Sequence, residues 1–70
     1  MELEWVDGFT IAAKVEHDSV VISANKEGLL SLANHLTTLA NEEGPTSHFH
    51  LDQYNSLEDG SVELIIEKTI

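Results

Sequence analysis

Alternation of apolar and polar residues predicts β-strands at the start of the chain. From Phe9 to Val15 every second residue is apolar, the period of a strand with one buried face. The segment 16–19 is polar and turns the chain into a second apolar run, Val20 to Ile22. If Val15 pairs with Val20, Ala13 lies opposite Ile22 and the apolar faces agree. We therefore expect an antiparallel hairpin here.

An earlier strand is predicted from Leu3 and Trp5, which alternate with polar residues before Val6-Asp7-Gly8. A two-residue Asp-Gly turn would place Trp5 on the wrong face. A three-residue turn with Gly8 in a left-handed conformation pairs Trp5 with Phe9 instead. We prefer the second register.

Between Asn25 and Glu43 the apolar spacing changes to that of an α-helix. Ser23 or Asn25 can cap its start, and Gly44-Pro45 can end it. Leu30 lies at the margin of the apolar stripe. The stripe expected to face the core consists of Leu29, Leu32, Ala33, Leu36, Leu39 and Ala40.

Two further strands are predicted after the helix. In 47–51 the apolar residues Phe49 and Leu51 alternate with polar ones, and Val62, Leu64 and Ile66 do so near the end of the chain. Ile65 shares the outward face with Glu63 and Glu67. The chain is thus predicted to be one α+β domain, residues 1–70, with a sheet of about five antiparallel strands and one helix packed on one face, in the order ββ(β)αββ. The order of the strands in the sheet does not follow from the pattern.

The charge narrows the functions that such a domain can have. Thirteen Asp and Glu residues against three Lys and no Arg give a formal charge of −10. Binding to nucleic acid or to an anionic membrane surface requires clustered cations, and here the lysines are scattered. An acidic field accelerates encounter with a basic protein, although it can also serve solubility alone. The chain lacks cysteine and any apolar run of the roughly 20 residues that span a bilayer, so we expect it in the cytoplasm.

A polar stripe on one predicted strand is the first candidate for chemistry. His48, His50 and Asp52 are two residues apart and share a strand face, as zinc ligands can. Neither His17 nor His35 is placed by the sequence to complete such a site. We favour a solvated or partner-facing strand and expect no metal and no cofactor.

The run 52–60 is the second candidate. It fails as a calcium-binding EF-hand loop, because Tyr54 occupies the third position and Leu57 the sixth, where an oxygen ligand and Gly are needed. It can be a surface connection in which Asn55 caps a helical turn ended by Gly60, with Leu57 in the core. It can also be a recognition loop, since Tyr, Asn, Ser and acids are typical of protein-binding surfaces. The two interpretations are compatible.

Catalysis is not expected from this sequence. None of the six serines lies in a Gly-x-Ser-x-Gly elbow, and the four glycines are too dispersed for a phosphate-binding loop. Neighbouring acids such as Glu58 and Asp59 could act as acid and base, but a run of acids is more often a solvated surface.

Three segments of the chain carry a resemblance to a known family: SANKEGLLSLA at 23–33, SHFHLDQYNSLEDGS at 47–61 and ELIIE at 63–67. They resemble the immunity protein 32 family of bacterial polymorphic-toxin systems. The resemblance extends over residues 20–68 and excludes the amino-terminal hairpin. The family pattern has an aliphatic residue at Phe49 and a Gly at Thr46.

The resemblance implies a non-catalytic protein that binds and neutralises one cognate toxin domain. An acidic protein suits a basic target, and nucleases, with their cationic clefts, are one class of such toxins. Competing interpretations are a small acidic adaptor or regulator that binds partners through a sheet edge, and a homodimer formed through Trp5 or Ile65. The residues expected to contact the toxin are His48, His50, Asp52, Tyr54, Asn55, Glu58 and Asp59.

Overall fold

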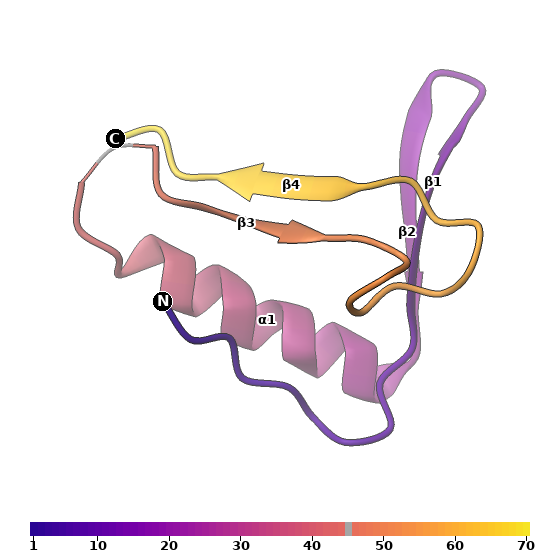
Figure 1. The fold of residues 1–70 in the computed structure, drawn as a ribbon, viewed down its shortest axis with the longest axis horizontal. Coiled ribbons are helices and arrows are strands. Elements are labelled where there is room, and N and C mark those ends of the chain that lie inside the picture. The colour runs from indigo at the N-terminus through magenta and orange to yellow at the C-terminus, as the bar shows by residue number, and fades with distance from the viewer. Residues whose placement is uncertain (45) are drawn as a thin grey trace.

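A computed structural model describes residues 1–44 and 46–70 and shows an α+β fold with two separate small sheets (Figure 1). The elements in chain order are β1 (Ile11–Glu16), β2 (Ser19–Ala24), α1 (Lys26–Ala40), β3 (His48–Leu51) and β4 (Leu64–Glu67). β1 pairs with β2 and β3 with β4, both antiparallel. The α+β class is therefore confirmed, whereas the single sheet of about five strands is wrong.

The amino-terminal segment 1–10 contributes no strand. Gly8 does adopt a left-handed conformation (φ 86°), and the Phe9 N–H donates to the Val6 carbonyl across that turn (3.3 Å). However, the Val6 N–H donates to the Ser31 hydroxyl on α1 (2.8 Å) instead of to a neighbouring strand. Trp5 and Phe9 still meet as expected, with ring centroids 4.5 Å apart. The segment lies along the helix, so the predicted strand pairing is wrong.

The free edge of β1 is occupied by the loop that precedes β4. The Glu58 and Val62 N–H groups donate to the carbonyls of Ile11 and Ala13, each at 2.9 Å. The Ala13 N–H in turn donates to the Ser61 hydroxyl (3.1 Å). This loop satisfies the backbone groups that a third strand would otherwise pair, which explains why the two sheets stay separate.

The β1–β2 hairpin has the predicted register. Val15 pairs with Val20, and Ala13 with Ile22. The two-residue turn places both His17 (φ 47°) and Asp18 (φ 67°) at positive φ, as a turn matching the twist of a hairpin requires. The hairpin extends away from the remainder of the molecule (Figure 1), so the side chains near its tip are exposed.

Asn25 begins α1, as one of the two predicted caps. Its Oδ1 accepts from the N–H groups of Gly28 (2.7 Å) and Thr10 (2.9 Å), which joins the helix start to the amino-terminal segment. The helix ends at Ala40 with Asn41 as C-cap, earlier than predicted. Of the predicted stop signal, Gly44 lies beyond the helix and Pro45 lies outside the described residues.

Lys68 stabilises the other end of α1. Its Nζ donates to the carbonyls of Ala40 (3.2 Å) and Glu42 (2.6 Å). The last turn of the helix contains no basic residue of its own, and a cation here interacts favourably with the helix dipole. Glu42 and Glu43 follow the negative end of the helix dipole, where acids are mildly unfavourable. Lys68, a residue beyond the last strand, offsets this effect.

The face that α1 buries differs from the predicted apolar stripe. The structure buries Leu32 and Leu39 as expected but leaves Leu29 and Leu36 about half exposed. A Cβ on Gly28 would lie 2.4 Å from the Thr10 carbonyl oxygen, so this glycine allows β1 and the helix to approach closely. The side of α1 that carries the small residues Gly28 and Ser31 therefore faces the core, because only small residues allow this close contact. The buried helix residues are Gly28, Ser31, Leu32, His35 and Leu39.

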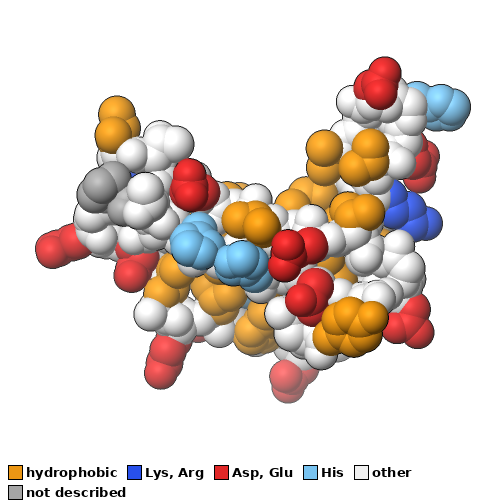
Figure 2. All heavy atoms as spheres, turned by 45° about the horizontal axis from the view of Figure 1, so that its top comes forward, with side chains coloured by type: hydrophobic (Ala, Val, Ile, Leu, Met, Phe, Trp, Pro, Cys, Tyr) orange, Lys and Arg blue, Asp and Glu red, His pale blue; other side chains and the backbone are white. Residues whose placement is uncertain are grey.

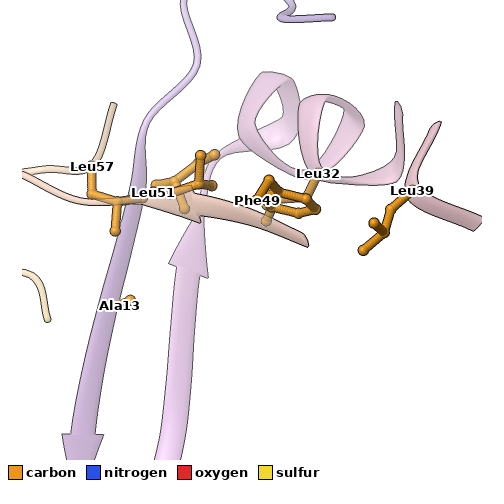
Figure 3. Packing of buried hydrophobic residues seen from close by; sticks show 7 residues of the cluster. Ala13, Leu32, Leu39, Phe49, Leu51 and Leu57 are labelled. Carbon is orange, nitrogen blue, oxygen red and sulfur yellow. The ribbon is translucent and has the colours of Figure 1, made fainter. Parts of the chain in front are cut away.

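The core lies between α1, β3 and the inner end of the hairpin (Figure 3). Phe49 and Leu51 face inward from β3, as predicted, and Leu57 joins them from the loop. Leu64 and Ile66 pack against this cluster from β4, while Ile65 is exposed. The inward and outward residues within β4 are therefore as predicted, but the prediction that Val62 begins the inward face is wrong, because Val62 precedes the strand and is exposed. In the described part of the chain, no helix is long and apolar enough to cross a membrane.

Candidate functional site

The outward side of β3 and β4 carries the two histidines that the sequence singled out. His48 and His50 alternate with the buried Phe49, and their ring centroids lie 4.9 Å apart. His48 pairs with Glu67, and His50 with Ile65, across the two strands. The His50 Nδ1 lies 3.4 Å from Glu63 Oε2. Figure 2 shows histidine side chains at the surface next to acidic and hydrophobic ones.

A tight turn follows β3 and presents Tyr54. The Asp52 carboxylate accepts from the N–H groups of Tyr54 (2.9 Å) and Asn55 (3.1 Å). Asn55 Oδ1 accepts from the Asp52 N–H (3.0 Å) and from the Ser56 hydroxyl. Asp52, not Asn55, therefore caps the helical turn. The result is a rigid support for the Tyr54 side chain, which is 88% exposed.

The second half of the loop returns to the same region. The Gly60 N–H donates to Gln53 Oε1 (2.9 Å), which brings the end of the loop back to the turn. Leu57 is buried, as predicted, and anchors the loop in the core. Glu58 and Asp59 are exposed, although Glu58 is held through its backbone against β1. We call the exposed residues of this region, together with the partly buried Asp52, the β3 surface: His48, His50, Asp52, Tyr54, Asn55, Glu58, Asp59, Glu63, Ile65 and Glu67.

The three residues of the predicted polar stripe do not come together as a group of metal ligands. Asp52, the third member of the predicted polar stripe, follows the strand, and its carboxylate caps the turn instead of lying beside the imidazoles. Within residues 1–44 and 46–70, no group of three or more His, Asp or Glu side chains could hold a metal ion.

A pocket of about 550 Å³ opens beside the β3 surface. One wall comes from the amino-terminal segment and the other from β3 and the following turn. Trp5 and Phe9 give it an aromatic side, while His50 and Asn55 place polar atoms at it. Its lining consists of Leu3, Trp5, Phe9, His50, Leu51, Asn55 and Ser56.

The sequence interpretation missed two parts of this site. Glu63, Glu67 and Ile65 lie beside the histidines because of the β3–β4 register, and the matching alternation of the two strands could have placed them there. The aromatic wall of the pocket could not be foreseen, because it depends on where segment 1–10 docks.

His35 lies under the site, in the interior. It is fully buried on α1, and its ring contacts those of Trp5 (centroids 4.2 Å apart) and Phe49 (5.6 Å). Neither ring nitrogen has a hydrogen-bond partner of normal geometry. Desolvation lowers the pKa of His35, and the backbone of Glu4 offsets this only in part. His35 is thus a neutral core residue linking the amino-terminal segment to β3.

The exposed aromatic, imidazole and acidic side chains around a pocket define a surface suited to binding another protein. The family model of immunity protein 32 matches residues 19–69. The chain therefore belongs to the immunity protein 32 family, and the resemblance seen over residues 20–68 is confirmed. Comparison with curated proteins and with solved structures finds no match. Immunity proteins neutralise a cognate toxin, and they generally do so by binding and not by catalysis.

Proposed function

We propose that this chain is a non-catalytic immunity protein that binds a basic toxin domain of a polymorphic-toxin system, such as a nuclease, in the cytoplasm. The match to the immunity protein 32 family carries the toxin-binding part of the proposal. We infer a basic toxin from the charge of −10. A nuclease needs a cationic cleft to hold phosphates, and an acidic protein competes for that cleft.

The arrangement of charge supports a basic partner. Of the three lysines, Lys68 is used to cap α1, whereas Lys14 and Lys26 are exposed on other elements. The β3 surface contains five acids and no lysine. A field of one sign raises the association rate with an oppositely charged protein, most strongly at low salt.

The pocket supplies a second, apolar component of binding. Binding energy concentrates in a few buried anchors that fill pockets, and Leu3, Trp5 and Phe9 form an apolar wall of suitable size. The amino-terminal wall lies outside the family match, while the wall from β3 lies within it. We therefore assign discrimination among toxins to the amino-terminal wall. Tyr54 stands next to the pocket on its rigid turn and offers a large contact area.

A charge reversal tests the proposed orientation of the complex. The pair Glu58→Lys and Asp59→Lys should slow association with the purified toxin domain at least about tenfold at low salt, and less at high salt. The matched control is Glu16→Lys with Asp18→Lys, which changes the net charge equally at the exposed tip of the β1–β2 hairpin. Stopped-flow or surface-binding kinetics would measure both. Equal slowing by the two pairs would contradict the assignment of the β3 surface.

A further inference from the structure

Four of the six residues in the predicted apolar stripe of α1 are exposed. Leu29 is 57% exposed and Leu36 is 48% exposed. Ala33, which lies between them in the sequence, and Ala40, which follows them, are exposed as well. These four positions are separated by four, three and four residues. That is the spacing of the seam along which two helices pack in a coiled coil. We call these four residues the α1 seam.

The α1 seam lies in an uncharged part of a strongly acidic chain. From Gly28 to Asn41 the sequence contains no Asp, Glu, Lys or Arg. Two copies with a charge of −10 each repel one another wherever their acids meet. Along this helix two copies can approach without bringing carboxylates together. A basic toxin, by contrast, would gain nothing from the charge pattern of the α1 seam.

The geometry points to a second copy of this chain as the occupant, and we propose that the protein forms a two-fold symmetric dimer through antiparallel packing of the α1 seams. In the antiparallel arrangement centred between residues 34 and 35, Leu29 faces Ala40 of the other copy and Leu36 faces Ala33. Each large side chain then meets a small one, which allows close packing. The symmetry is that of an isologous dimer.

The dimer leaves the β3 surface free. Phe49 and Leu51 of β3 face the core that α1 covers, and the histidines alternate with them on the opposite side. Each copy can therefore bind its own toxin, and the dimer does not depend on the proposed function.

Sedimentation equilibrium of the full chain, without toxin, tests the dimer. The weight-average mass should rise from 7.7 kDa toward twice that value with concentration. Added salt should strengthen the association, because it screens repulsion between the acids outside the seam. Toxin binding through the β3 surface should show the opposite salt dependence, so the two proposals can fail separately.

Two variants of nearly equal exposure locate the interface. Leu36→Glu places a carboxylate in the α1 seam and should weaken dimerisation at least about tenfold. Leu30→Glu adds the same charge at a leucine that is 47% exposed but lies about a third of a turn away from Leu36 around the helix. The dissociation constant of the Leu30→Glu dimer should stay within about threefold of that of the unchanged protein. Circular dichroism would verify that both variants are folded.

The possible outcomes separate cleanly. A monomer at all concentrations into the millimolar range, at both low and high salt, would overturn the proposal. A dimer that both variants weaken equally, or that neither weakens, would also overturn it, because the interface would then lie elsewhere. The sedimentation measurement on the unchanged chain requires no variant, so it tests the dimer even if Leu36→Glu does not fold.

Discussion

Replacing Gly28 by Ala tests how the contact between β1 and α1 sets the orientation of the helix. In an unconstrained helix interior, Ala is favoured over Gly by about 1 kcal/mol. Here the added Cβ would lie 2.4 Å from the carbonyl oxygen of Thr10, and 3.0 Å from both Ala24 Cβ and Ile11 Cγ1. The closest atom belongs to the backbone, so a side-chain rotation cannot relieve the clash.

Forcing extra volume into a packed contact typically costs about 1 to 3 kcal/mol. Gly28 lies in the first turn of α1, where the propensity gain is partly lost. We therefore expect Gly28→Ala to lower the free energy of unfolding by about 1 to 2 kcal/mol. For a domain of this size that corresponds to a fall in Tm of roughly 5 to 15 °C.

Urea unfolding followed by the fluorescence of Trp5, the single tryptophan, would measure the change. Trp5 reports on the correct region because its ring packs against His35 of α1. The control is Ala33→Gly on the exposed side of the same helix, measured at a protein concentration at which the chain is monomeric, so that it should lose about 1 kcal/mol through propensity alone. If Gly28→Ala instead stabilised the protein while Ala33→Gly destabilised it, the close approach of β1 and α1 would be refuted.

Three further predictions concern other sites. Because burial lowers the pKa of His35 from its ordinary 6.5, the unfolded chain binds more protons below that pH. The free energy of unfolding should then fall on acidification, with a slope of up to about 1.4 kcal/mol per pH unit. Urea unfolding at a series of pH values should show a smaller slope for His35→Leu. An unchanged slope would contradict the assignment of this effect to His35. Thr46 adopts a left-handed backbone conformation (φ 69°), so Thr46→Gly should yield a protein that is more stable by about 0.5 to 1 kcal/mol. A lower Tm would show that the left-handed turn is not formed. Tyr54→Ala should weaken toxin affinity at least about tenfold without changing Tm. The control Ile70→Ala, at another highly exposed position, should change neither the affinity nor Tm. If calorimetric titration gave equal affinities for the two variants, Tyr54 would not belong to the interface.

The sequence pattern correctly predicted the features that depend only on residues nearby in the sequence. The hairpin register follows from alternation alone, because shifting Val15 against Val20 by one residue would turn the apolar faces apart. The cap by Asn25 and the inward positions of Phe49 and Leu51 are also local. The orientation of α1 was not predictable in this way, because it depends on the approach of Thr10 to Gly28 from outside the helix.

The same reasoning applies to the site. The sequence placed His48 and His50 on an exposed strand face, because strand alternation fixes that choice once Phe49 is buried. The sequence did not show that the Asp52 carboxylate turns back and accepts from the N–H groups of its own turn. It does so because two backbone donors lie within reach of the side chain, and these bonds are favoured over an exposed strand position. The pocket was missed because Trp5 was paired in a strand, whereas the Ser31 hydroxyl takes the Val6 N–H and holds the segment on the helix.

Affinity capture at two salt concentrations tests whether the acidic surface recognises a basic toxin domain. The tagged chain would be incubated with lysate of its source organism at low and at high salt, and the bound proteins identified by mass spectrometry. We expect recovery of a basic toxin domain at low salt, with much less recovered at high salt. Recovery of an ordinary cellular protein, to the same extent at both salt concentrations, would contradict this expectation and favour an adaptor whose acidity serves only solubility.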